Sequence, residues 1–172
     1  MRTGRRAALG AGIAFGAGLL VHARAAHARA AVPLFRITRS KNANVVQYDA
    51  MLKSAAELDP REPVVCYWLE LAEDGRREPL RGLEHRAYGF KVAPERGGSW
   101  LLYLNAARDR AVRVVHWQGR WVAQVVIAGR SAVLTRIFVA SDESGLIPSV
   151  RWIDLFGVDM VTGKPSTERV KP

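Results

Sequence analysis

Residues 111–140 read AVRVVHWQGRWVAQVVIAGRSAVLTRIFVA, and this stretch decides the fold class. Three runs rich in β-branched and apolar residues (112–117, 120–127 and 131–139) are separated by the dipeptides Gln118-Gly119 and Ala128-Gly129. Short separators that contain glycine, between runs of this kind, are typical of tight β-hairpins. The stretch therefore predicts a β-meander of three antiparallel strands.

The expected register of this meander places three candidate ligand-binding side chains on one face of the sheet. Directly opposed residues of antiparallel strands share a face of the sheet. If both dipeptides form two-residue turns, His116 lies opposite Trp121, and Trp121 lies opposite Arg136. The same face is otherwise apolar, so we expect it to be the inner one. His116, Trp121 and Arg136 are the candidate ligand-binding residues, since such a cluster can stack on a ligand or bind an anion.

Two other interpretations of this cluster stay open. In the first, Arg136 stacks on Trp121 at the rim of the sheet and binds no ligand. The second concerns the turns, because a type I′ turn requires positive φ at both central residues, which neither Gln118 nor Ala128 favours. A three-residue turn with a bulge at each glycine would shift the register and turn Arg136 away from Trp121.

The rest of the chain also alternates mostly with period two, as around Phe35 and Ile37. Further strands are predicted at 45–51, 64–71, 90–92, 100–104 and 150–156, with a short helix at 79–87. We expect a single domain over residues 31–172. Its predicted fold is a single antiparallel β-sandwich or small barrel of about eight strands with at most one short helix.

Residues 1–30 have the pattern of a cleavable signal peptide. Arg2, Arg5 and Arg6 precede a weakly apolar segment at 7–21, and Ala28-Arg29-Ala30 is a cleavage signal before Ala31. The apolar segment is too short to cross a membrane, so no stable membrane insertion is expected after cleavage. We expect a periplasmic or secreted protein; Arg5-Arg6 favours the twin-arginine export route, with the general secretory route as the alternative.

The net charge is +10, from 26 basic and 16 acidic residues. The first thirty residues hold five arginines and no acid, so the mature part keeps 21 basic and 16 acidic residues, a net charge of +5. Such a charge suits an anionic or saccharide ligand, although basic residues scattered over a solvated surface give the same total. We expect no nucleic-acid partner.

Motifs for catalysis or metal binding are missing from the sequence. It contains no H-E-x-x-H, C-x-x-C, G-x-S-x-G or P-loop pattern, and the mature part has two isolated histidines, His85 and His116. The single cysteine, Cys66, is expected to be a small buried side chain, and residues 141–145 an acidic surface turn rather than a calcium loop. The sequence therefore predicts neither a metal site nor a cofactor.

Carboxylates are the remaining candidates for catalysis. Asp49, Glu70 and Asp154 lie within runs otherwise rich in apolar residues. A pair of them within ~5–10 Å in a cleft would indicate a hydrolase of the glycosidase type. A cleft lined by tryptophan and arginine without such a pair would indicate a binding protein. Outward-pointing carboxylates that pair with arginines are the simpler interpretation.

Several short segments together resemble a known bacterial family. They are Asn42-Ala43-Asn44 with Tyr48-Asp49, Tyr67-Trp68 with Glu73-Asp74-Gly75, Ala87-Tyr88-Gly89-Phe90, Arg136-Ile137-Phe138-Val139 and Leu155-Phe156-Gly157. In their order and spacing the chain is similar, from Leu34 onward, to domain of unknown function 4833. The resemblance implies a bacterial, exported protein and brings no reaction, ligand or catalytic residue.

The favoured interpretation is an exported bacterial cell-envelope protein that acts as a non-catalytic module and binds a ligand or partner. The alternative is a carboxylate-dependent cell-envelope hydrolase. The missing catalytic motifs favour the first.

Overall fold

The computed structural model describes residues 30–40, 43–142 and 149–171. The predicted leader, apart from Ala30, lies outside these residues, as do Asn42 of the turn at 42–44 and the part of the acidic turn at 143–145. The strands are β1 (Ala31–Arg39), β2 (Val45–Ser54), β3 (Glu57–Leu58), β4 (Val64–Leu69), β5 (Arg77–Pro79), β6 (Phe90–Pro94), β7 (Trp100–Leu104), β8 (Ala107–Trp117), β9 (Arg120–Ile127), β10 (Arg130–Asp142), β11 (Ser149–Asp159) and β12 (Pro165–Val170). The one α-helix in this part of the chain is α1 (Gly82–Tyr88), and Arg96–Gly98 form a single 3₁₀ turn.

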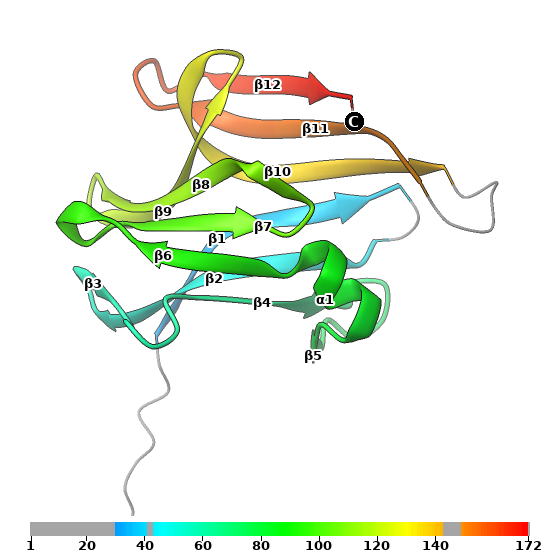
Figure 1. Cartoon of the computed structure of the whole chain (residues 1–172), viewed down its shortest axis with the longest axis horizontal. Helices are drawn as coiled ribbons and strands as arrows, with labels where there is room; N and C mark the ends of the chain where they lie inside the picture. The colour runs from blue at the N-terminus through cyan, green and yellow to red at the C-terminus, as the bar shows by residue number, and fades with distance from the viewer. Residues whose placement is uncertain (1–29, 41–42, 143–148, 172) are drawn as a thin grey trace, which may run out of the picture.

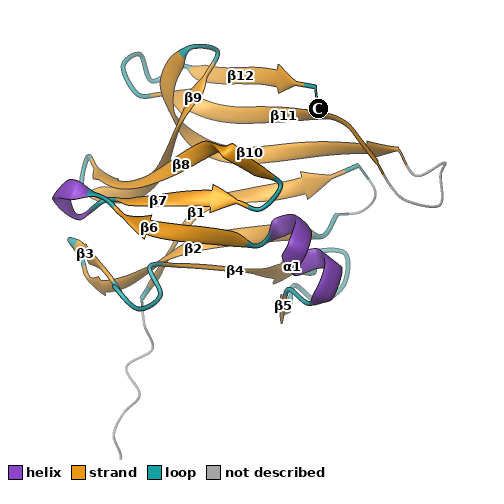
Figure 2. Cartoon of the chain, viewed as in Figure 1, coloured by secondary structure: helices purple, strands orange, loops and turns teal. Residues whose placement is uncertain are grey.

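The strands form a curled sheet that makes a half-barrel (Figures 1 and 2). Nine strands lie along one path, in the order β5-β4-β2-β1-β10-β9-β8-β7-β6. Beside this path, β11 pairs with β10 and with β12, and β3 pairs with β2. The long strand β10 is the junction, because its start pairs with β9, its later part pairs with β1, and β11 follows it along the other edge.

The two hairpins of the predicted meander are confirmed. Gln118 and Gly119 have φ of 47° and 78°, and Ala128 and Gly129 have φ of 50° and 77°. Both turns therefore have two residues with positive φ, as type I′ geometry requires, and both accept a residue other than glycine or asparagine at the first position.

A bulge in β10 lies immediately after the second hairpin. The pairing of β10 with β11 shifts between Leu134 and Arg136, so Thr135 is an extra residue in β10. At this point the strands approach closely: a Cβ atom on Gly157 would lie 2.5 Å from the Val133 carbonyl oxygen. Bulges bend a strand and increase its twist, which helps this sheet to curl.

The core fills the inside of the curl and joins the two ends of the strand path. Tyr48 on β2 is fully buried, stacks on Phe35 at 4.4 Å between ring centroids, and contacts Phe90 of β6 at 6.0 Å. Its hydroxyl donates a 2.5 Å hydrogen bond to the carbonyl of Tyr88 at the end of α1. Side-chain packing therefore closes the half-barrel between β2 and the α1–β6 segment.

The prediction of a mostly β fold with one short helix is confirmed, whereas the single sandwich of about eight strands is not, and two features of the sheet differ from the prediction. The described residues form twelve strands where about eight were predicted, because β3, β5 and β12 are short or polar and lack an apolar alternation. The sheet is not purely antiparallel, since β1 and β10 pair in parallel between residues 36–39 and 136–139. The predicted helix at 79–87 is present as α1 over Gly82–Tyr88. None of the helices in the described part of the chain is long and apolar enough to span a membrane.

Candidate functional site

Two of the three predicted ligand-binding residues are in contact. His116 and Trp121 are directly opposed on β8 and β9, as predicted. Their rings lie 5.4 Å apart in an edge-to-face arrangement, with Trp121 buried and His116 exposed. The ligand-binding role of this pair stays a prediction.

Arg136 is not part of this cluster, so its predicted opposition to Trp121 is wrong. The pairing of β9 with β10 ends at Gln124 and Val133, before Arg136 is reached. The extra residue in β10 then turns the Arg136 side chain to the outer face, where its guanidinium carbon lies 3.9 Å from the ring centroid of Phe156. The three-residue turns considered as an alternative are not present, and the extra residue that turns Arg136 away lies within β10.

Each of the three candidate catalytic carboxylates is held by its own partners. Asp49 is only 2% exposed and accepts hydrogen bonds from the Tyr67 hydroxyl at 2.6 Å and the Gln47 side-chain amide at 2.9 Å. Asp154 accepts two hydrogen bonds from Arg169, at 2.7 and 2.9 Å, which hold the pKa of Asp154 below its usual value.

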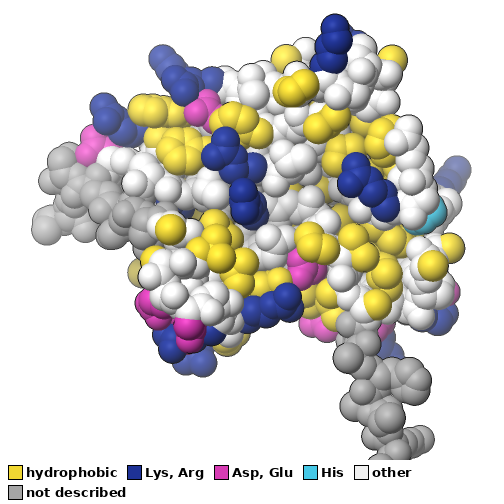
Figure 3. Space-filling model, turned by 180° about the vertical axis from the view of Figure 1, so that it is seen from behind, with side chains coloured by type: hydrophobic (Ala, Val, Ile, Leu, Met, Phe, Trp, Pro, Cys, Tyr) yellow, Lys and Arg dark blue, Asp and Glu magenta, His cyan; other side chains and the backbone are white. Residues whose placement is uncertain are grey.

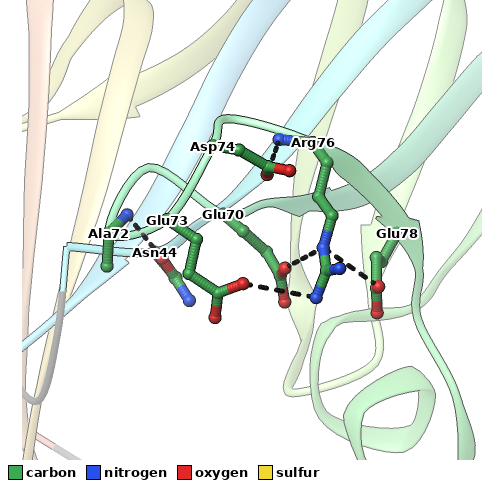
Figure 4. Close-up of polar contacts among 7 residues, drawn as sticks. All are labelled: Asn44, Glu70, Ala72, Glu73, Asp74, Arg76 and Glu78. Carbon is green, nitrogen blue, oxygen red and sulfur yellow. Dashed lines mark hydrogen bonds and ion pairs between the residues drawn. The ribbon is translucent and has the colours of Figure 1, made fainter.

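Glu70 belongs to a separate charged group in the turn after β4. Its carboxylate accepts a 2.6 Å hydrogen bond from Arg76 Nε, and Glu73 and Glu78 also contact this guanidinium at 3.3 Å (Figure 4). Three carboxylates thus share one arginine, which raises the pKa of Arg76. The group stabilises an exposed turn rather than presenting a free acid.

The strand register separates Asp49 from Asp154. Asp49 is paired with Pro33 on β1. Asp154 is paired with Phe138 on β10, which is in turn paired with Thr38 on β1. Three strand spacings of ~4.8 Å and five residues of ~3.3 Å each lie between them. Their separation is well beyond the ~10 Å at which two carboxylates can act on one glycosidic bond.

A cavity with a volume of about 460 Å³ lies inside the half-barrel. It is bounded by the inner faces of β10, β11 and β12, by β8 and the turn before it, and by the end of α1. Its apolar lining consists of Ile37, Ala87, Tyr88, Leu104, Ala106, Ala107, Val112, Val125, Leu134, Ile137, Val139, Val150, Ile153, Leu155 and Val170.

Three charged residues complete the lining. Arg110 pairs with Glu168 at 2.7 Å, and the second carboxylate oxygen of Glu168 accepts the Ala128 N–H at 2.7 Å. These two donors hold the pKa of Glu168 below its usual value, the backbone N–H having the larger effect. Asp109, the third charged residue, is exposed. The cavity therefore combines an apolar body with a small group of charged side chains.

Sequence reasoning placed several lining residues on the inner face but did not find the cavity. Val112, Val125 and Leu134 belong to the predicted apolar face of the meander. The signal that could have indicated a void is the small size of Ala106 and Ala107 beside it, where larger side chains would fill the space.

Comparisons with known proteins agree with the family suggested by the sequence. The family model described as domain of unknown function (DUF4833) matches residues 35–169, which is most of the chain and nearly all of the described fold. Neither curated proteins nor solved structures give a match. The half-barrel with its apolar cavity is thus the fold of a member of the DUF4833 family, to which this chain belongs.

Proposed function

We propose that this domain is a non-catalytic binding module that takes a ligand with an apolar body into the half-barrel cavity. The observation that carries the proposal is the cavity itself, about 460 Å³ in volume and lined by fifteen apolar and three charged residues. Binding sites for small molecules have volumes of roughly 300–1,000 Å³, are mostly apolar, and contain a few polar groups that orient the ligand.

The packing of the surrounding core supports the proposal that a ligand occupies the cavity. Protein interiors are close-packed, and voids larger than a water molecule are few. Val139, Ile153 and Val170, which line this cavity, pack against the core and are only partly buried. A ligand with an apolar body would restore the dispersion contacts that these side chains lack on the cavity side.

We further propose that the protein is a bacterial cell-envelope protein exported after removal of residues 1–30. The signal pattern at 1–30 supports this, and so does the start of β1 at Ala31, directly after the predicted cleavage signal. N-terminal sequencing of protein recovered from the periplasm or medium is expected to begin at Ala31. Recovery of that protein with Met1 intact would contradict the proposal.

The cavity is tested by binding of an uncharged apolar fluorophore, N-phenyl-1-naphthylamine, to the folded domain. Val139 is half-buried, belongs to the inner face of β10 and lines the cavity, so Val139→Trp fills it. We expect this variant to bind the fluorophore at least about tenfold more weakly than the wild type, a loss of roughly 1.4 kcal/mol.

The matched control is Val126→Trp, the same change at a residue of β9 that is 51% exposed and does not line the cavity. It is expected to bind like the wild type. The cavity proposal fails if the wild type does not bind the fluorophore, or if Val139→Trp keeps its circular dichroism spectrum and binds as well as Val126→Trp.

A further inference from the structure

The outer face of the sheet carries a line of residues that crosses five strands. Tyr67 on β4 is paired with Gln47 on β2, Gln47 with Arg36 on β1, Arg36 with Arg136 on β10, and Arg136 with Phe156 on β11. Residues paired in this way share a face. In Figure 1, β1, β2 and β10 lie behind β6 to β8. Figure 3 shows the molecule from behind, and Lys and Arg side chains lie among hydrophobic ones across the middle of this view.

One end of this line holds an arginine in a fixed position. The Tyr67 hydroxyl is anchored to the buried carboxylate of Asp49 at 2.6 Å, which fixes the tyrosine ring. The guanidinium carbon of Arg77, from the neighbouring strand β5, lies 4.6 Å from the centroid of that ring. Arg77 is therefore oriented by Tyr67 while its side chain stays exposed.

The other end has the same construction. The guanidinium carbon of Arg136 lies 3.9 Å from the ring centroid of Phe156, and both residues are half-buried. Stacking on a ring uses the face of a guanidinium and leaves the N–H groups at its edge free to donate hydrogen bonds. Such an edge matches the two oxygens of a carboxylate.

The middle of the line brings two like charges together. Arg36 and Arg136 are direct neighbours on β1 and β10, and like charges in this position destabilise a sheet. Within the described residues, Arg36, Arg77 and Arg136 form no direct ion pair with an acid. The Asp154 carboxylate, which pairs with Arg169, also interacts electrostatically with Arg136. By contrast, carboxylates pair with Arg76, Arg110, Arg113, Arg130 and Arg169.

We propose that Arg77, Arg36 and Arg136, here called the arginine stripe, bind an acidic polysaccharide through its carboxylates. Four strand spacings of ~4.8 Å separate Tyr67 from Phe156, so the stripe is about 19 Å long and suits an extended chain with repeated charges. This site lies on the outside of the sheet and is independent of the cavity.

The apolar and aromatic side chains near the stripe argue against nucleic acid and a membrane as its partner. Single-stranded nucleic acid requires free aromatic faces on which bases stack, whereas Arg77 and Arg136 cover the rings of Tyr67 and Phe156. A membrane surface requires protruding apolar side chains in addition to charge. The large apolar residues that are exposed in the described chain are Leu71, Leu83, Val126, Val150, Val158 and Val161. None of them belongs to the line, and Val158, two residues after Phe156 on the same face of β11, is only 36% exposed.

The test is titration of the folded domain with polygalacturonate, followed by calorimetry at low and at physiological salt. Arg36→Gln and Arg136→Gln are each expected to weaken binding at least about tenfold. The matched control is Arg120→Gln, which removes the same charge from an exposed residue next to the turn between β8 and β9, and should change affinity less than about twofold. Because Arg36→Gln removes a like-charge contact, its melting temperature without ligand should equal or exceed that of the wild type.

Three outcomes would overturn the proposal. The first is no binding of polygalacturonate by the wild type. The second is an equal loss of affinity in Arg120→Gln, which would indicate binding by net charge alone. The third is binding of single-stranded DNA or of phosphatidylglycerol vesicles as tightly as polygalacturonate, which would assign the stripe to another class of partner.

Discussion

At the scale of single residues, the sheet places Cys66, the single cysteine of the sequence, against the core. Cys66 lies on β4 directly opposite the buried Tyr48, and its own side chain is partly buried. Burial disfavours the charged form and raises the pKa of the Cys66 thiol to about 11. The sequence-based expectation of a small side chain packed against the core is thus close to what the structure shows.

This pKa predicts slow modification of the native protein. The thiolate is the reactive form, and a pKa higher by about two units lowers its fraction at pH 8 by roughly 100-fold. We expect iodoacetamide to label Cys66 about 100-fold more slowly in the native protein than in urea, with a native rate that still increases above pH 10. Equal rates in the native and unfolded states would show that the thiol is neither buried nor shifted.

At the scale of elements, the two hairpin turns contain residues that are not the preferred ones. Gln118 and Ala128 have positive φ at the first position of type I′ turns, where asparagine is favoured and β-branched residues are strained. The meander therefore forms because its strands pair and bury their inner face, and it tolerates strain in the turns. That strain leaves room to stabilise the protein.

Substitutions at Gln118 are expected to change stability in both directions. Gln118→Asn should increase the free energy of unfolding by about 0.5–1 kcal/mol, since asparagine adopts the left-handed conformation more readily. Gln118→Val should decrease it by about 1 kcal/mol or more, because a β-branched side chain is disfavoured there. Urea unfolding of both variants checks the prediction, and equal stability of the two would contradict the observed turn geometry.

At the scale of the whole molecule, Glu168 connects elements that are far apart in the sequence. From β12 it reaches Arg110 on β8 and the backbone of Ala128 in the turn between β9 and β10. These contacts border the cavity and hold the last strand against the meander. They depend on the ionised carboxylate, whose pKa is lowered in the folded protein.

This linkage predicts a loss of stability in acid. Because the pKa of Glu168 is lower in the folded state than in the unfolded state, the folded protein binds fewer protons in acid. The contribution of Glu168 to the free energy of unfolding is therefore complete above the ordinary pKa of 4.5. That contribution is lost as the pH falls through the lower pKa of the folded state. Glu168→Gln should lower the free energy of unfolding at pH 7 by about 1–3 kcal/mol and flatten its decrease below pH 4.5.

The control for Glu168 is Glu57→Gln, the same change in an exposed pair with Lys53. It is expected to change stability by less than about 0.5 kcal/mol, because exposed ion pairs contribute little. Denaturant unfolding between pH 3 and pH 7 measures both variants. An unchanged pH profile in Glu168→Gln would mean that this carboxylate does not stabilise the closed half-barrel.

The sequence by itself determined the local features of this protein. The alternation of apolar residues and the two glycine-containing separators specify three paired strands with His116 opposite Trp121, because both signals act between residues close in the chain. The composition of the other segments similarly specifies an all-β domain with one short helix. The inner-face residues Val112, Val125 and Leu134 were also predictable, since they follow the same alternation.

Only the tertiary structure decided the features on which function is proposed to depend. Arg36 and Arg136 are neighbours because β1 and β10 pair in parallel across one hundred residues, a contact that no local pattern encodes. Thr135 moves Arg136 from the predicted inner cluster to the outer face, because β10 changes partners from β9 to β1 and the bulge absorbs the change. The cavity likewise depends on the distance between the strands that line it, such as β8 on one side and β10 and β11 on the other. Packing of the whole curled sheet sets this distance, and no single strand does.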